Sequence, residues 1–192
     1  MGALDQQQVG VRHRLTADQV QRMVRTGVLD SSARVELIDG ELFDMAPIGH
    51  PHGFFCQAIA AQLIDLVGAR RVLVQMSLTL GENDTVQPDI CVLSSAEAHH
   101  LVTGPELAAV QLVIEISDTS LAYDLNKKLP RYSAAGVPEL WVLDVTAKRL
   151  LLHREPEGAR YAVVRELKPS AHVRPTLLPD FELDLAALFA GR

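Results

Sequence analysis

The sequence predicts an α/β domain with a mixed sheet and helices on its faces, and three neighbouring segments carry this prediction. Residues 111–117 have one apolar face, and Val113 makes the other face partly apolar, which is typical of a central strand covered on both sides. A helical segment follows, in which Leu125, Leu129 and Tyr132 recur along one face. Residues 140–143 then form another apolar strand, so the order is strand, helix, strand.

Length and composition limit the possible classes of protein. The chain has 192 residues, of which 48% are hydrophobic, enough for one domain over 1–192 with its core at about 15–189. No apolar run approaches 18 residues and the N-terminus lacks the apolar core of a signal peptide, so we expect no membrane span and no secretion. The net charge of −6 argues against a large non-specific DNA-binding surface, but it leaves room for a local basic patch.

The two cysteines, Cys56 and Cys91, each lie within an apolar stretch. This pattern favours small buried thiols over a disulfide or a metal site. We therefore expect a reducing, cytoplasmic location.

The N-terminal part of the chain predicts a helix, a hairpin and a second helix. Thr16 and Gln19 match a capping box at the start of a helix over 15–27. Asp39-Gly40 is a favoured two-residue turn, and it predicts a hairpin over 35–45. The second helix is expected over 52–67.

The remaining elements follow from alternating patterns and turn residues. Strands are predicted over 71–80 and 86–93. Residues 94–109, with His99 and His100, form a polar connection that is a candidate loop over the site. After the central segment, two C-terminal strands are expected over 149–154 and 161–165, joined by a turn at 155–158. Asp184 is a candidate N-cap for a short closing helix.

The chemistry centres on two acids, Asp89 and Glu115, that lie in neighbouring apolar strands. Two buried carboxylates repel each other, and burial disfavours their charge, so a divalent cation would stabilise both. Mg²⁺ prefers one or two carboxylates together with waters and phosphate oxygens. With a lysine nearby, these parts suit the metal-assisted hydrolysis of a phosphodiester. The alternative to a catalytic role is a structural one, in which a buried acid pairs with Lys128 or a backbone N–H and holds the sheet to the helix.

The lysine that serves this site is predicted from the helical pattern. Lys128 flanks the apolar face of the helix, whereas Lys127 points away from it. Pro130 is tolerated in the first turn of a helix, so this helix is expected to begin near Asn126. Gly136 and Pro138 end it.

Several motifs resemble one bacterial family. They are VELIDGEL, HPHG before a helix, QPDICVL, LVIEIS and YDLNKKLPRYSAAGVPELWVLD. Together they resemble the Uma-two family of putative restriction endonucleases, a family placed in the PD-(D/E)XK nuclease superfamily. The resemblance runs from about Leu15 to Phe189, and it implies a restriction-endonuclease-like mixed sheet flanked by helices, with an added N-terminal helix and hairpin and added C-terminal strands.

The resemblance also implies roles for individual residues. Asp89 matches the metal-binding aspartate of the superfamily, and Glu115 matches its (D/E) position. The usual lysine two residues later is replaced by Ser117, and the resemblance suggests that Lys128 on the helix takes its place. Asp89, Glu115 and Lys128 are therefore the predicted catalytic residues, and the first two are the predicted metal ligands.

Four further residues are possible additions to the site. They are Glu36 on the hairpin, His52 at the start of the second helix, Gln75 on the strand beside Asp89, and Asp124, which could instead pair with Lys128 four residues later. His50 is more simply a turn residue, and His99 and His100 are solvated loop residues.

These observations predict a metal-dependent nuclease. Mg²⁺ or Mn²⁺ is the expected cofactor, nucleic acid and above all double-stranded DNA the expected substrate, and a homodimer the expected assembly. Ser117 and the acidic net charge favour an alternative, a degenerate nuclease fold that binds nucleic acid or a protein without cutting. A third interpretation makes the acids and the lysine a structural contact in the core.

Overall fold

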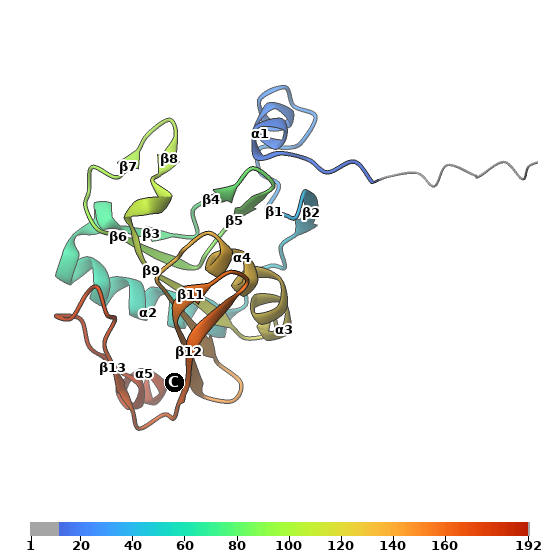
Figure 1. Cartoon of the computed structure of the whole chain (residues 1–192). Coiled ribbons are helices and arrows are strands. Elements are labelled where there is room, and N and C mark those ends of the chain that lie inside the picture. The colour runs from blue at the N-terminus through green and yellow to red at the C-terminus, as the bar shows by residue number, and fades with distance from the viewer. Residues whose placement is uncertain (1–11, 192) are drawn as a thin grey trace, which may run out of the picture.

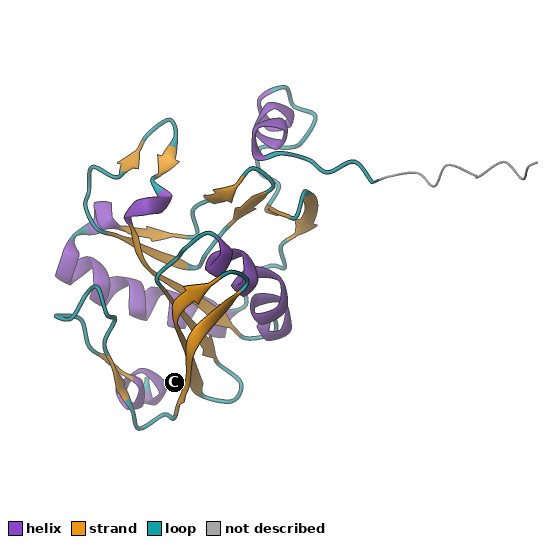
Figure 2. Cartoon of the chain, viewed as in Figure 1, coloured by secondary structure: helices purple, strands orange, loops and turns teal. Residues whose placement is uncertain are grey.

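The computed structural model describes residues 12–191, and these build a large and a small β-sheet with helices packed around them (Figures 1 and 2). The N-terminal segment, for which no signal peptide is predicted, lies outside the described residues as far as residue 11. The large sheet has the strand order β12-β11-β10-β9-β6-β3, and the small sheet has the order β2-β1-β5-β4. The prediction of an α/β fold with a mixed sheet is confirmed.

The strands of the large sheet are β3 (Val72–Val74), β6 (Ile90–Leu93), β9 (Val110–Ser117), β10 (Glu139–Asp144), β11 (Arg149–Glu157) and β12 (Arg160–Leu167). The small sheet contains β1 (Val35–Ile38), β2 (Glu41–Asp44), β4 (Leu78–Gly81) and β5 (Asp84–Val86). Two short pairs remain, β7 (His99–His100) with β8 (Gly104–Pro105), and β13 (His172–Val173) with β14 (Leu183–Asp184).

The helices are α1 (Ala17–Arg25), α2 (His50–Val67), α3 (Leu121–Tyr123), α4 (Leu129–Ala134) and α5 (Leu185–Ala190). Between α3 and α4 runs the π-helical segment η3 (Asp124–Lys128), and single 3₁₀ turns lie at η1 (Ala69–Arg71) and η2 (Leu107–Ala109). The capping box of Thr16 and Gln19 and the N-cap of Asp184 are both present, as the sequence predicts.

The two middle strands, β9 and β10, are parallel, whereas every other neighbouring pair in the large sheet is antiparallel. Parallel neighbours need a crossover, and the segment α3-η3-α4 supplies it. Gly136, with a φ of 78°, ends this helical segment before β10 begins. The crossover helix therefore lies over the carboxyl end of β9, where Glu115 and Ser117 are found.

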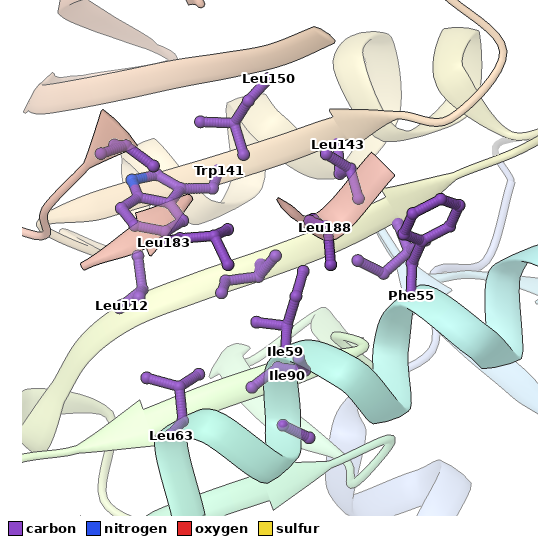
Figure 3. Packing of buried hydrophobic residues seen from close by; sticks show 14 of the residues in the cluster. Phe55, Ile59, Leu63, Ile90, Leu112, Trp141, Leu143, Leu150, Leu183 and Leu188 are labelled. Atoms are coloured by element: carbon purple, nitrogen blue, oxygen red, sulfur yellow. The ribbon is translucent and has the colours of Figure 1, made fainter. Parts of the chain in front are cut away.

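One face of the large sheet packs against α2 and α5 (Figure 3). Phe55, Ile59 and Leu63 of α2 lie on side chains from β6, β9 and β10, among them Ile90, Leu112 and Trp141. These apolar side chains are fully buried. Because α2 is anchored along this length, its first turn is held beside the start of β6.

The opposite face packs against α4 and the small sheet. Tyr132 of α4 lies in this second core with Val113 and Val142 of the large sheet, and Leu78 and Val86 come from the small sheet. Glu115 has the same parity along β9 as Val113, so its side chain leaves the sheet on this face. The predicted two-faced burial of this strand is confirmed, since every residue from Leu112 to Ser117 is buried.

Two predicted strands are each broken where the chain passes between the sheets. The predicted strand 71–80 divides at Gln75, which has a φ of 51°, into β3 in the large sheet and β4 in the small sheet. As a result, Val74 and Met76 are exposed rather than packed on one apolar face. The predicted strand 86–93 divides likewise into β5 and β6, because Pro88 has no N–H for a sheet.

Other boundaries differ less. The C-terminal hairpin is longer than predicted, with β11 running to Glu157 and the reversal at Gly158, where φ is 61°. The helical segment does not begin near Asn126 but at Leu121, which is a correction discussed with the site. Cys56 and Cys91 are buried and unbridged, as predicted. Within residues 12–191 no helix is both long enough and apolar enough to cross a bilayer.

Candidate active site

A cavity of about 400 Å³ opens between the β1–β2 hairpin, the start of α2, the ends of β6 and β9, and the α3-η3 segment. Its charged lining residues include Arg34, Glu36, Asp89, Glu115, Asp124 and Lys128. Glu36 lies in β1, Glu115 in β9, and Asp124 and Lys128 in η3, whereas Arg34 and Asp89 lie just before β1 and β6. Three of the residues predicted from the sequence as the core of the site therefore line one cavity.

Lys128 reaches the cavity through the π-helical segment. The N–H of Leu129 donates to the carbonyl of Asp124, five residues earlier, and this widens the turn. Pro130 follows and has no N–H for the carbonyl of Asn126, which is why a regular α-helix does not close here. In this wider turn, the side chains of Asp124 and Lys128 both line the cavity, and both residues are buried. Pro130 lies in the first turn of α4, as predicted, but the helical segment as a whole begins earlier than Asn126, at Leu121.

The ammonium of Lys128 lies among carboxylates. Its Nζ is 2.6 Å from Glu115 Oε1, 3.1 Å from Glu36 Oε1 and 4.0 Å from Asp124 Oδ1. It also donates to the carbonyl of Gln87 at 3.3 Å. The side chains of Lys128, Glu36 and Glu115 are each less than 5% exposed, so water contributes little to their solvation. The single ammonium of Lys128 therefore lies within 4.0 Å of three carboxylates.

Glu36 and Glu115 are held in place by further hydrogen bonds. The Gln87 N–H donates to Glu36 Oε1 at 2.8 Å, and the Tyr123 hydroxyl donates to Oε2 at 3.0 Å. The Tyr132 hydroxyl donates to Glu115 Oε1 at 2.5 Å. Both tyrosines belong to the crossover segment, so this segment supplies the lysine and also orients its two nearest acids.

Asp124 is bound from the position where a nuclease of this superfamily would carry its lysine. The hydroxyl of Ser117 donates to Asp124 Oδ2 at 2.7 Å, and that of Ser120 donates to the same oxygen at 2.6 Å. Ser117 is completely buried. Ser117 therefore ties the end of β9 to the helical segment that carries Lys128.

Asp89 lies just before β6 and is surrounded by donors. His52 Nε2 is 2.9 Å from both of its oxygens, the Ile116 N–H donates to Oδ2 at 2.8 Å, and the Gln75 side-chain amide donates to Oδ1 at 3.2 Å. Gln75 can reach Asp89 because the chain turns at that residue, and its own N–H donates to the Asp89 carbonyl. His52 Nδ1 is buried without a hydrogen-bond partner among the described residues.

The two predicted metal ligands differ in acidity. Burial raises the pKa of the Asp89 carboxyl, but the hydrogen bond and charge of His52, the Ile116 N–H and the charge of Lys128 outweigh it and hold this pKa below its usual value. Burial raises the pKa of the Glu115 carboxyl well above its usual value, and Lys128 offsets only part of this effect. Asp89 is therefore ionised at neutral pH, whereas Glu115 needs a cation or a proton.

Lys128 stays charged. Burial by itself would lower the pKa of its ammonium, but the charges of Glu115, Glu36 and Asp124 outweigh burial and raise this pKa above the ordinary value. Burial raises the pKa of Asp124 despite the nearby lysine and serines. The cluster thus carries more acid than one ammonium neutralises.

The donor set fits a hard divalent cation. Within residues 12–191 no three acid, histidine or cysteine side chains gather around one point, so no closed metal cage is formed. Mg²⁺ requires no such cage, since it usually takes one or two carboxylates and completes its shell with water and phosphate oxygens. Asp89, which is ionised, and Glu115, which lacks full compensation for its charge, would hold such an ion.

The additional candidates fall into two groups. Glu36, His52, Gln75 and Asp124 all contact the central residues, through Lys128 or through Asp89. By contrast, His50 is exposed, and His99 and His100 lie in the β7–β8 hairpin, where His100 Nε2 is 2.6 Å from Glu106. None of residues 94–109 lines the cavity, so the expectation of a loop over the site is wrong.

The sequence does not predict that Arg34 and Tyr123 belong to this site. It places Tyr132 on the helix but does not predict that this residue orients Glu115. Tyr132 was assigned to the apolar face of the helix, and its position four residues after Lys128 was the available signal. Arg34 precedes Glu36 by two residues and so lies on the same side of an extended segment. Nothing near Tyr123 in the sequence indicates its contact with Glu36.

Comparisons with known proteins agree with this fold. The sequence model of the family Uma2, described as "Putative restriction endonuclease", matches residues 17–186. A crystal structure of a protein from Anabaena variabilis, described as a putative nuclease belonging to DUF820, superposes with a TM-score of 0.70 at 16% identity. The superposition covers 92% of this chain and 98% of that one. Among curated proteins, no sequence matches the chain.

Proposed function

The chain belongs to the Uma2 family of restriction-endonuclease-like proteins, and from that premise we propose that it is a metal-dependent nuclease that hydrolyses phosphodiester bonds of DNA. One observation carries the proposal. The crossover helix places a buried, charged lysine 2.6 Å from Glu115, at the end of a strand on which Ser117 replaces the lysine usual in this superfamily. The cationic part of a nuclease site is therefore supplied from another element.

In this proposal Asp89 and Glu115 hold Mg²⁺ or Mn²⁺. When bound, such an ion polarises a phosphate oxygen and makes a bound water more acidic. Lys128 is too strongly held as a cation to act as a neutral base, so its charge stabilises the negative charge that develops on phosphorus. Glu36 and Tyr132 keep Lys128 and Glu115 in their positions. The Ser117 hydroxyl fixes Asp124 and takes no part in the chemistry.

A cleavage assay tests the proposal. The chain would be incubated with duplex DNA, single-stranded DNA and RNA, each with Mg²⁺, with Mn²⁺ or with chelator, and with Asp89→Asn as the matched variant. Metal-dependent cutting of duplex DNA by the wild type and its loss in Asp89→Asn are expected. Calorimetry with Mn²⁺ adds a readout independent of cutting, and equal binding by the wild type and Asp89→Ala would contradict the assignment of Asp89 as a ligand.

The alternative is a nuclease fold that binds nucleic acid without cutting it. Ser117 favours this alternative, because it stands where the superfamily usually carries its catalytic lysine. The same assay separates the two. Binding without cleavage under every metal condition would favour the alternative.

We also propose that the protein is a cytoplasmic homodimer that acts on double-stranded DNA. A two-fold dimer places two sites in the symmetry of a duplex. An uncharged groove of about 440 Å³ on the outward side of α2 supports a self-complementary contact, and it is lined by Gly53, Gln57, Ala61, Ile64 and Val74, among others. The free, buried thiols of Cys56 and Cys91 support a reducing compartment.

A further inference from the structure

We propose that Arg34 is the phosphate anchor of this cavity, the residue that binds a backbone phosphate of the nucleic acid beside the phosphate to be cut. The inference rests on the proposed nuclease function, and it names a residue that neither the sequence motifs nor the metal chemistry requires. Its basis is the position of Arg34 at the cavity, its freedom from ion pairs, and the full engagement of Lys128.

The position of Arg34 is fixed by the β1–β2 hairpin. The N–H of Met45 donates to the Arg34 carbonyl at 2.9 Å, so the hairpin continues one residue beyond the Val35–Asp44 pair. Alternate residues of an extended chain point to the same side, and Arg34 lines the cavity together with Glu36. Arg34 is only partly buried, so its guanidinium reaches the solvent-accessible part of the cavity.

The guanidinium of Arg34 has no carboxylate partner among the described residues. Other arginines around this hairpin are paired: Arg12 with Glu41, Arg14 with Asp39, and Arg131 with Asp84 at 3.4 Å. Arg34 remains unpaired although acids surround the cavity. A planar guanidinium suits the bidentate binding of a phosphate.

Lys128 cannot take this role. Its side chain is only 4% exposed, and its ammonium is already engaged by Glu36 and Glu115. A nucleic-acid strand also brings phosphates on both sides of the one that reacts, and these need a cation that is more exposed than Lys128. Among the lining residues, Arg34 and Lys128 are the only arginine or lysine. The flanking phosphate is therefore left to Arg34.

Binding, measured without cleavage, tests the inference. In an Asp89→Asn background, the anisotropy of a labelled 20-nucleotide strand, alone and as a duplex, would be measured over a series of salt concentrations. Arg34→Gln should weaken binding about tenfold and reduce the salt slope by about 0.7 for the single strand or 0.9 for the duplex, the value for one lost phosphate contact. Arg34→Lys should restore most of the slope, because it keeps the charge.

Arg165→Gln is the matched control, since Arg165 is an exposed arginine on β12, remote from the cavity lining. It should leave affinity and slope unchanged. An unchanged slope in Arg34→Gln, an equal effect of Arg165→Gln, or no binding of either oligonucleotide would overturn the inference. If the wild type cuts nothing but Arg34→Gln still lowers the slope, the nuclease proposal fails and the phosphate anchor stands. If the wild type cuts DNA and the slope does not change, the reverse holds.

Discussion

Lys128 combines a structural and a chemical role, and the two can be separated by substitution. Removing its charge leaves Glu36 and Glu115 buried beside each other without their cation. Breaking a buried ion pair in this way costs about 3–5 kcal/mol, so Lys128→Met should lower the melting temperature at pH 7. It should also lower cleavage about 10²-fold or more, the cost of one lost transition-state contact, in assays run below the new melting temperature.

Two controls distinguish these effects. Lys128→Met combined with Glu115→Gln removes both charges of the closest pair, so the melting temperature should partly recover while cleavage stays low. The neighbouring Lys127 is exposed, as predicted, but it is a poor control, because its ammonium lies 5.8 Å from the centre of the Phe43 ring. Lys168→Met, at an exposed lysine, should change neither quantity. Wild-type cleavage by Lys128→Met would reduce Lys128 to a structural partner of Glu115.

His153 gives a second prediction at the residue scale, unconnected with catalysis. It lies on β11 with its ring 5.8 Å from that of Tyr161, and both ring nitrogens are buried without a partner in the described structure. Burial lowers the pKa of this imidazole to about 4. The folded protein therefore holds His153 neutral at a pH at which the unfolded chain is already protonated.

Stability should respond to pH accordingly. The folded pKa lies below the unfolded value of about 6.5, so the unfolded state binds the extra proton as pH falls from about 6.5 towards 4. Stability is complete above this window and falls within it, by at most about 1.4 kcal/mol per pH unit for one proton. Urea unfolding at pH 7 and pH 5 should show a smaller loss in His153→Leu than in the wild type. Equal losses would exclude His153 as the source.

At the scale of elements, the sequence predicts what repeats along the chain. The strand β9, the hairpin turn at Asp39-Gly40 and the cap at Asp184 all follow from local spacing, and each is confirmed. The π-helical turn at 124–128 does not follow, because the helical pattern of apolar residues tolerates one extra residue in a turn. The breaks at Gln75 and Pro88 depend on which sheet each half joins, and this is decided by partners far away in the chain.

The sequence likewise predicts some residues of the site and misses others. Asp89 and Glu115 are carboxylates inside apolar strands, and Lys128 flanks an apolar helix face, so their unusual surroundings are visible in the sequence. The surroundings of Arg34 and Tyr123 are ordinary, and their place at the cavity comes only from the folding of the hairpin against the crossover helix. Residues that are costly to bury are thus easier to predict than residues that simply line a wall.

At the scale of the whole molecule, α2 has two roles. Its inward side packs on the large sheet and holds His52 beside Asp89. The helix also lines a groove, together with Val74 and Gln75 at the end of β3, and this groove has no charged residue in its lining. Ile48 lines both this groove and the candidate active site, so a contact made in the groove lies next to the site.

We predict that a second copy of the chain covers this groove. Each copy carries a net charge of −6, so two copies repel each other and associate most readily through an uncharged surface. Light scattering at micromolar concentration should therefore give the mass of a dimer. Ala61→Glu should shift it to a monomer, since Ala61 is exposed in the groove and the new carboxylate would be buried in the contact without a partner.

The control is Ala187→Glu, which adds the same charge at an exposed alanine of α5 outside the groove. It should leave the mass unchanged, and neither variant should unfold, because both positions are exposed. Cutting of both strands of a duplex in one binding event should be lost with the dimer, whereas nicking of one strand should persist. A wild type that stays monomeric at every micromolar concentration, or an Ala61→Glu variant that remains dimeric, would show that the groove is not the dimer interface.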